Sequence, residues 1–204
     1  MSTLATGDWH AILSSLNPIL LQSKELRDHL KPEALANGWC GSQPASESEI
    51  QEAELRLGVS LPPSYRAFLS ISNGWRPFSS FIEQLLPVQG IEQFRVADPE
   101  DLGLIQKYYK EDEVSDSEYL DYETPKHNVA LRHRYYPECI VIGKAWDGGA
   151  GELVLLNPHI TFPNGEWETI FFGNWLPGNW RYRSFREFVE QSVTLERIET
   201  PRSK

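Results

Sequence analysis

A glycine-rich run at 148–151, Gly-Gly-Ala-Gly, is the first candidate for chemistry in this chain, because such runs can bind phosphates. A P-loop places a Lys and a Ser or Thr after its last glycine to hold phosphates and metal, whereas Glu152 stands there in this chain. A dinucleotide-binding motif opens a helix, whereas an apolar run at 153–156 follows here. The spacing therefore predicts a tight turn between two strands and no bound cofactor.

The histidines and cysteines are the next candidates for chemistry. His127 and His133 are six residues apart and flanked by basic residues, unlike the H-E-x-x-H spacing that puts two imidazoles on one helical face for zinc. Cys40 and Cys139 are too few and too far apart for a disulfide framework or a cysteine-based zinc site. We expect no catalytic residue and no metal site, and we keep as an alternative a hydrolase that uses Cys139 or the histidines.

Charge is distributed unevenly. The chain carries a net charge of −10, and residues 98–123 hold ten acids against two lysines. Clustered Lys and Arg are needed to neutralise phosphates, so the charge disfavours direct nucleic-acid binding, and we expect none. A basic protein partner would be attracted instead. The alternative is an ordinary solvated loop. The predicted partner-binding acids of this segment are Asp112, Glu113, Asp116, Glu118 and Asp121.

Tryptophan is abundant, with seven residues in 204. Trp buries a large area at small entropic cost and is enriched at the energetic centres of interfaces. Trp75 and Trp167 are expected in the core. The predicted partner-binding residues stand beside Gly-, Pro- and Asn-rich loops, and they are Trp146, Asp147, Trp175 and Trp180.

The most regular segment that could position such residues spans 46–75. Ser46 and Glu49 have the spacing of a capping box at a helix start, and Gly58 can end that helix in the left-handed conformation. Prolines at 62 and 63 suit the first turn of a second helix, which Asn73-Gly74 is expected to end. Two short helices joined by an elbow are predicted.

This order of residues resembles the SMI1/KNR4 family of the SUKH superfamily. The resemblance continues at the C-terminus as strand, Gly-Gly turn, strand, Asn-Gly turn, strand and a final helix, and it covers roughly 46–192. Its N-terminal part rests on Ile50, Glu54, Leu57, Gly58, Val59, Leu61, Pro62, Tyr65, Phe68, Leu69, Asn73, Gly74 and Trp75. The resemblance implies an α+β fold, with N-terminal helices, a central, mostly antiparallel sheet and a C-terminal helix.

The remaining elements are predicted from apolar patterns and breakers. Residues 1–41 form a helical extension, interrupted at Asn17-Pro18, and 42–204 form the SUKH-like domain. Strands are expected at 86–88, at 139–142 and at 153–156, the last closed by Asn157-Pro158. A hairpin turn is expected at Asn164-Gly165, and a capping box from Ser184 to Glu187 should open the last helix. The stretch 111–127 should be an exposed loop with little to bury.

The resemblance also implies a function. Members of this family act mostly by binding and are implicated in protecting cells from polymorphic toxins, many of them nucleases. The leading hypothesis is a bacterial immunity protein that neutralises a cognate toxin. The alternative within the family is a regulatory scaffold in signalling or cell-wall synthesis. The N-terminus is unlike a signal peptide and no stretch of 18 apolar residues exists, so we expect a cytoplasmic protein without a membrane span.

Overall fold

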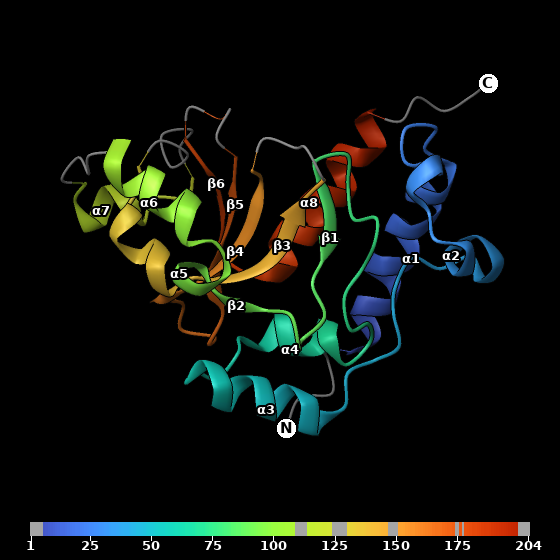
Figure 1. Ribbon diagram of the computed structural model, residues 1–204, viewed down its shortest axis with the longest axis horizontal. Helices are drawn as coiled ribbons and strands as arrows, with labels where there is room; N and C mark the ends of the chain where they lie inside the picture. Colours follow the sequence, from blue (N-terminus) through green and yellow to red (C-terminus); the bar gives the residue numbers. More distant parts are fainter. Residues whose placement is uncertain are drawn as a thin grey trace.

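The computed structural model describes residues 6–108, 114–123, 130–146, 151–173, 176 and 178–199. An antiparallel sheet lies between two layers of helices (Figure 1). Its strands follow one another in the order β1, β3, β4, β5 and β6, and β2 also pairs with β3. The bounds are β1 (Ile82–Leu85), β2 (Glu92–Gln93), β3 (Ile140–Ala145), β4 (Leu153–Thr161), β5 (Trp167–Phe172) and β6 (Trp180–Tyr182). The predicted α+β class is confirmed.

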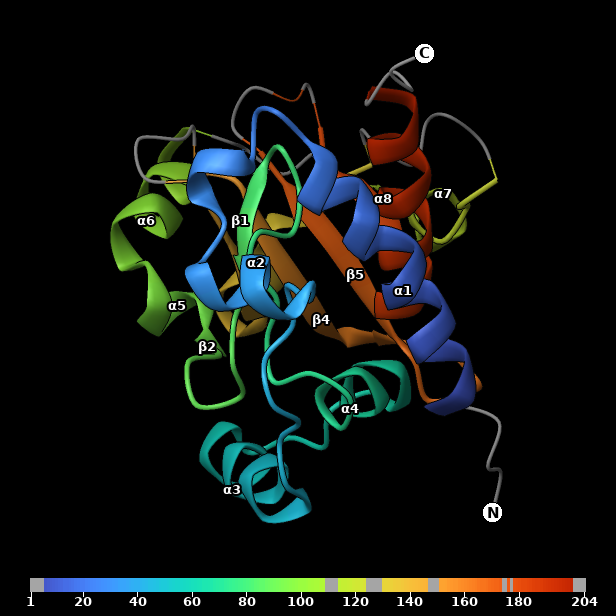
Figure 2. The same ribbon diagram turned by 90° about the vertical axis from the view of Figure 1, so that its right-hand side faces the viewer.

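One helical layer contains α1 (Thr6–Gln22), α4 (Pro63–Leu69) and α8 (Phe185–Glu199), and α1 runs beside α8 (Figure 2). An aromatic cluster joins these three helices. The ring of Trp9 lies 5.7 Å from that of Phe68 and 5.6 Å from that of Phe185. The ring of Tyr65 meets Phe185 edge-on at 4.9 Å. The N-terminal helix thus shares its core with the family-like helices, and the predicted division at residues 41 and 42 stays a prediction.

The predicted interruption of the first helix at Asn17-Pro18 is wrong, because α1 continues through Pro18. Proline removes one backbone N–H from the helix, but fully buried leucines at 16 and 20 hold the turns on either side of it. The buried side chain of Asn17 adds two bonds, donating to the Gly38 carbonyl at 2.6 Å and accepting from the Cys40 N–H at 2.8 Å. Tertiary packing outweighs the local preference of Pro18 here.

The helix pair of the 46–75 segment forms largely as predicted. The capping box of Ser46 and Glu49 is present at the start of α3 (Glu47–Leu57), and Gly58 ends it at a φ of 71°. Glu54 joins the two helices, because its carboxylate accepts from the Leu61 N–H at 2.7 Å and pairs with Arg66 at 2.5 Å. This acid of the family pattern therefore has a structural role.

The second helix ends earlier than predicted. α4 stops at Leu69 with Ser70 as its C-cap, and Asn73-Gly74 forms the turn that follows. Gly74 has a φ of 94°, and the next residue, Trp75, exchanges two backbone hydrogen bonds with Leu85 at the end of β1. The Asn-Gly-Trp sequence thus fastens the helix pair to the edge of the sheet.

We expect Gly74→Ala to destabilise the protein by about 1–3 kcal/mol more than Gly58→Ala. Both glycines have a positive φ, so both variants share the backbone penalty for a side chain there. A Cβ at Gly74 would lie 2.9 Å from the Leu85 carbonyl oxygen, whereas one at Gly58 meets nothing within 4 Å. Urea unfolding of the two variants measures the difference, and equal midpoints would contradict it.

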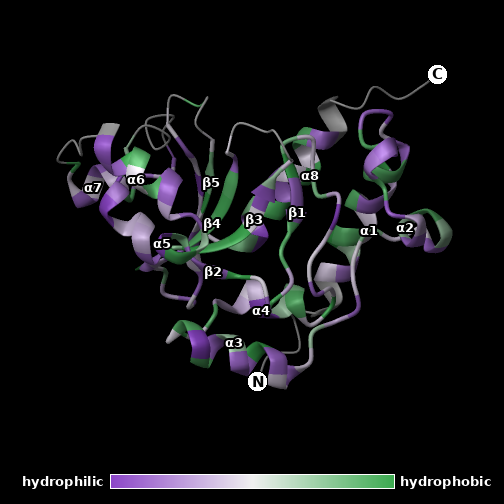
Figure 3. Ribbon diagram, in the orientation of Figure 1, coloured by the Kyte–Doolittle hydropathy of each residue, from purple (hydrophilic) through white to green (hydrophobic). Residues whose placement is uncertain are grey.

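The opposite helical layer contains α5 (Phe94–Ala97), α6 (Pro99–Tyr108), α7 (Asp116–Tyr119) and the 3-10 helix η3 (His133–Glu138). Figure 3 shows the hydrophobic residues of β3 and β4 between the two layers, in agreement with the buried side chains that begin each strand. Two short elements, the 3-10 helix η1 (Arg27–His29) and α2 (Pro32–Asn37), connect α1 to α3.

Several strand limits differ from the sequence-based ones. The predicted strand at 86–88 is wrong, since β1 ends at Leu85 before Pro87, which has no N–H to donate. β4 passes through Asn157-Pro158, because an irregularity in its pairing with β5 accommodates the proline. The hairpin turn at Asn164-Gly165 is confirmed, with Gly165 at a φ of 81°.

The predicted capping box of the last helix forms in part. The Ser184 hydroxyl accepts from the Glu187 N–H at 3.0 Å. The Glu187 carboxylate, however, accepts from the N–H of Arg183 at 2.6 Å.

Candidate functional site

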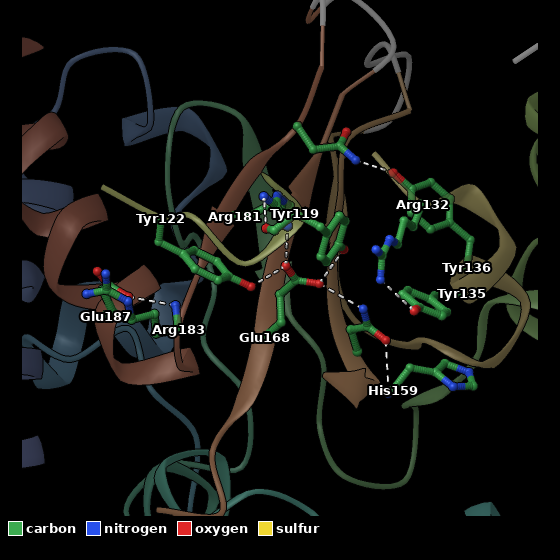
Figure 4. A network of polar contacts seen from close by, with 12 residues as sticks. Tyr119, Tyr122, Arg132, Tyr135, Tyr136, His159, Glu168, Arg181, Arg183 and Glu187 are labelled. Carbon is green, nitrogen blue, oxygen red and sulfur yellow. Dashed lines mark hydrogen bonds and ion pairs between the residues drawn. The ribbon is translucent and has the colours of Figure 1, made fainter. Parts of the chain in front are cut away.

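A buried polar cluster centres on Glu168, on the face of the sheet beneath α7 (Figure 4). The carboxylate of Glu168 is fully buried and accepts hydrogen bonds from the hydroxyls of Tyr119 at 2.8 Å and Tyr122 at 2.6 Å. The side-chain amide of Asn157 donates to it at 2.7 Å, and Arg181 pairs with it at 3.0 Å. A buried carboxylate needs such a complete set of partners, so this cluster fixes the elements that supply them.

Arg181 connects the same cluster to the backbone of the covering segment. Its guanidinium donates to the Tyr119 carbonyl at 2.7 Å and lies 4.0 Å from the centroid of the Tyr119 ring and 5.0 Å from that of Tyr122. Burial, with the nearby Glu168 carboxylate, raises the pKa of both tyrosines. Both hydroxyls therefore stay protonated at neutral pH and act as donors to Glu168.

Two further arginines hold the rest of the segment 114–123, which we call the acidic platform. Arg132 pairs with Asp116 at 2.5 Å, and its guanidinium donates to the Val114 carbonyl at 2.9 Å. Arg183 pairs with Glu123 at the other end of the platform. The prediction that this stretch buries little is wrong for 114–123, since Tyr119 is only 1% exposed. The platform is docked on the sheet.

The predicted acids have different surroundings on the platform. Asp116 is exposed but is paired with Arg132, whereas Glu118 is exposed beside it on α7. Asp121 is half-buried and accepts from the Glu123 N–H at 3.0 Å. Leu120 stands among them with 48% of its surface exposed. Asp112 and Glu113 lie outside the described residues.

The predicted surface tryptophans lie on the other side of the sheet. Along β6, Arg181 points to the platform, so its neighbour Trp180 points to the face that α8 covers, where its ring stacks on Phe171 at 5.3 Å. The Trp146 indole donates to the Ser79 carbonyl at 3.2 Å, and Ser79 lines the same pocket as Trp180. The Trp146 ring also lies 4.4 Å from that of His29, in the segment between α1 and α2. Asp147 and Trp175 lie outside the described residues.

Trp75 and Trp167 are buried, which confirms their predicted place in the core. Sequence reasoning missed Glu168 and Arg181, which lie in strands. A charged residue within the apolar run of β5 was the available signal, because an acid in a buried strand requires a partner.

Groups that could carry covalent chemistry are poorly placed for it. Cys139 is fully buried, and burial raises the pKa of its thiol well above the ordinary value, which disfavours the reactive thiolate. The pKa of Cys40 is raised to about 11 for the same reason. His159 pairs with Glu138 at 3.0 Å and stacks on Tyr135. Within the described ranges, no group of three or more His, Cys, Asp or Glu residues could hold a metal ion.

The model of the SMI1 / KNR4 family (SUKH-1) matches residues 44–191. The chain belongs to this family. The match starts within two residues of the predicted 46–192 and covers the helix pair, the sheet and most of α8 of this SUKH-1 protein. A search of the curated proteins finds no match. Among the described residues, no helix has the length and apolar character needed to cross a membrane.

Proposed function

We propose that this SUKH-1 protein acts by binding another protein through its acidic platform, as an immunity protein that neutralises a cognate toxin. The supporting observation is that the platform is docked: Tyr119 and Tyr122 anchor it to Glu168, and arginines hold both of its ends. A surface that is ordered before the partner arrives loses less conformational entropy on binding than a mobile loop would.

The charge of the platform favours a basic partner. Glu118, Asp121 and the paired Asp116 and Glu123 present carboxylates from one short segment. A surface that accepts nucleic acid is rich in Lys and Arg, so a toxin that is a nuclease would offer the complementary potential. Exposed Leu120 supplies an apolar contact among these charges. A standard interface of about 1,600 Å² would extend beyond the platform to its neighbours.

Stoichiometric inhibition is the test of this function. Proteins that co-purify with the chain from its native host are identified, and the activity of each is titrated with the purified SUKH-1 protein. Neutralisation by binding predicts that activity falls linearly and vanishes at one chain per partner molecule. Loss of activity at far below equimolar chain would instead indicate turnover and reject a binding mechanism.

A regulatory scaffold is the second function open to the family, and the same titration separates it from immunity. A scaffold partner would bind the chain with its own activity retained or redirected. A partner that is not basic, or that binds without being inhibited, would favour the scaffold.

We expect Glu118→Lys to slow association with a basic partner by between about two- and ten-fold at low salt. Glu118 is exposed on α7, so reversing its charge changes the field at the platform with little effect on packing. Glu33→Lys is the matched control, because Glu33 is exposed on α2, outside the platform. Stopped-flow association rates measured over a range of ionic strength give the result. Equal rates for both variants would remove Glu118 from the recognition surface.

A further inference from the structure

The outer face of α6 carries a glycine that the fold itself does not require. Gly103 lies in the middle of this helix and is not one of the glycines with a positive φ. A Cβ there would meet no atom of the described residues within 4 Å. Glycine is the least favourable residue in a helix interior apart from proline, so alanine would favour α6 at no steric cost. Gly103 thus weakens α6 without a compensating contact in the described chain, as expected where another molecule approaches the backbone closely.

Two exposed apolar side chains accompany Gly103. Leu104, the next residue, is 51% exposed, and Val96 on α5, which packs against α6, is 60% exposed. Leu102 and Ile105 are buried on the other side of the helix, so the exposed side is held in place before any partner arrives. Single exposed leucines are common on protein surfaces and mean little alone. Beside a bare backbone position, however, Leu104 offers a partner apolar contact where there is also room to approach.

The first turn of α6 adds negative charge to this surface. Asp98, Glu100 and Asp101 lie within four positions of each other, and none of the ion pairs in the described part of the chain includes them. Burial, together with the charges of Asp98 and Glu100, raises the pKa of the Asp101 carboxyl. Carboxylates crowded in this way are stabilised by a positive charge from a partner, whereas a second copy of this acidic chain would be repelled.

We propose that this α6 face, made of Glu100, Gly103 and Leu104, docks an amphipathic helix of the basic partner. That the partner is a basic protein rests on the proposed function, whereas the face rests on its own residues. Helices pack with ridges of side chains in grooves, and the distance between them depends on the side chains at the contact. Glu100 and Leu104 are one turn apart, and Gly103 leaves a gap beside them. An apolar ridge of the partner helix would enter this gap, with its basic residues towards the first turn of α6.

The position of α6 agrees with a partner that also contacts the platform. α6 packs on η3, in the same helical layer as α7. Arg132, the N-cap of η3, holds Asp116 of the platform. Figure 2 shows α6 and α7 at the two sides of this layer. A partner that rests on the layer would therefore contact the α6 face and the platform at the two ends of one interface.

The probe for the α6 face is a helical peptide with leucine on one side and lysine on the other, titrated into the full chain. It is compared with a scrambled peptide of the same composition and with a peptide that has glutamate in place of lysine. Binding is followed by NMR at the amide N–H signal of Gly103, which is assigned by its loss in Gly103→Ala. We expect the leucine–lysine peptide to shift this signal and to bind at least about tenfold more tightly than either comparison peptide.

Two variants separate docking from a structural role, with binding followed at the Leu104 amide in both. Gly103→Ala should raise the urea midpoint of unfolding by about 0.2–0.5 M, because it favours the helix. It should nevertheless weaken peptide binding at least about fivefold, because the added methyl group fills the gap. Thr194→Ala is the matched control. It also places alanine at an exposed helix position, on α8 in the opposite layer, and should leave peptide binding unchanged.

Equal binding of the peptide to Gly103→Ala and to the unmodified chain would overturn the proposal, as would equal binding of the scrambled peptide or no shift at Gly103. A Gly103 signal that moves on dilution of the chain alone would show instead that two copies meet at α6. If the peptide binds but no co-purified protein is inhibited by the chain, the α6 face stands and the neutralising function fails. If Gly103→Ala inhibits a partner as well as the unmodified chain does at limiting concentration, only the α6 assignment fails.

Discussion

Replacing Glu168 with alanine is expected to destabilise the protein by about 3–5 kcal/mol, because it leaves a buried arginine without its carboxylate. Arg181 is 3% exposed and has Glu168 as its ion-pair partner at 3.0 Å. The same change removes the acceptor of the Tyr119 and Tyr122 hydroxyls, which lie on the platform. Urea unfolding measures the loss of stability, and limited proteolysis of the native state should show faster cleavage within 114–123.

Two further variants separate the buried network from ordinary surface pairing. Glu123→Ala removes the more exposed pair with Arg183 and should change stability by at most about 1 kcal/mol. The double variant Glu168→Leu with Arg181→Met replaces both charges by apolar groups and should recover much of the stability lost in Glu168→Ala. A loss of less than 1 kcal/mol in Glu168→Ala itself would show that water or a rearranged side chain compensates Arg181, and the platform would then not depend on the network.

The sequence predicted best what is determined by neighbours along the chain. The capping box of α3, the left-handed Gly58 and the Asn-Gly hairpin depend on residues within a few positions of each other, and all three formed. Pro18 and Pro158 carried equally strong local signals, but both were misinterpreted as ends of elements. Leu16 and Leu20 are buried around Pro18, and β4 continues past Pro158 through an irregularity in its pairing with β5. Both reasons involve distant elements and are invisible to a local pattern.

The candidate site shows the same division. The charge of the 98–123 segment is a property of composition and could be recognised directly. Its docking could not, because Glu168 lies 49 positions beyond Tyr119, and nothing local pairs them. Likewise, the alternation along β6 points Trp180 away from the face that Arg181 shares with the platform. Trp180 and the platform acids, which were predicted as partner-binding residues together, therefore lie on opposite faces of the sheet. Which of the predicted residues share a binding surface therefore depends on how the sheet arranges residues that are distant in the sequence.

Replacing Trp9 with alanine is expected to lower the free energy of unfolding of the whole domain by about 3–5 kcal/mol. Trp9 is 1% exposed, and its ring packs between Phe68 of α4 and Phe185 of α8. Both of these phenylalanines belong to the 44–191 range of the family match, whereas Trp9 precedes it. A helix outside the matched range would therefore stabilise the family domain itself. Urea unfolding followed by circular dichroism measures the effect.

The shape of the transition decides whether α1 belongs to the domain or only rests on it. If α1 shares the cooperative core, Trp9→Ala should move one single transition to lower urea concentration, with its slope preserved. Leu35→Ala is the matched control, because Leu35 is 58% exposed on α2 and its truncation should change stability by less than about 0.5 kcal/mol. An early, separate loss of helical signal with an unchanged main transition would mean that α1 unfolds independently. The domain would then begin near residue 42, as its sequence suggested, and α1 would be an accessory layer over α4 and α8.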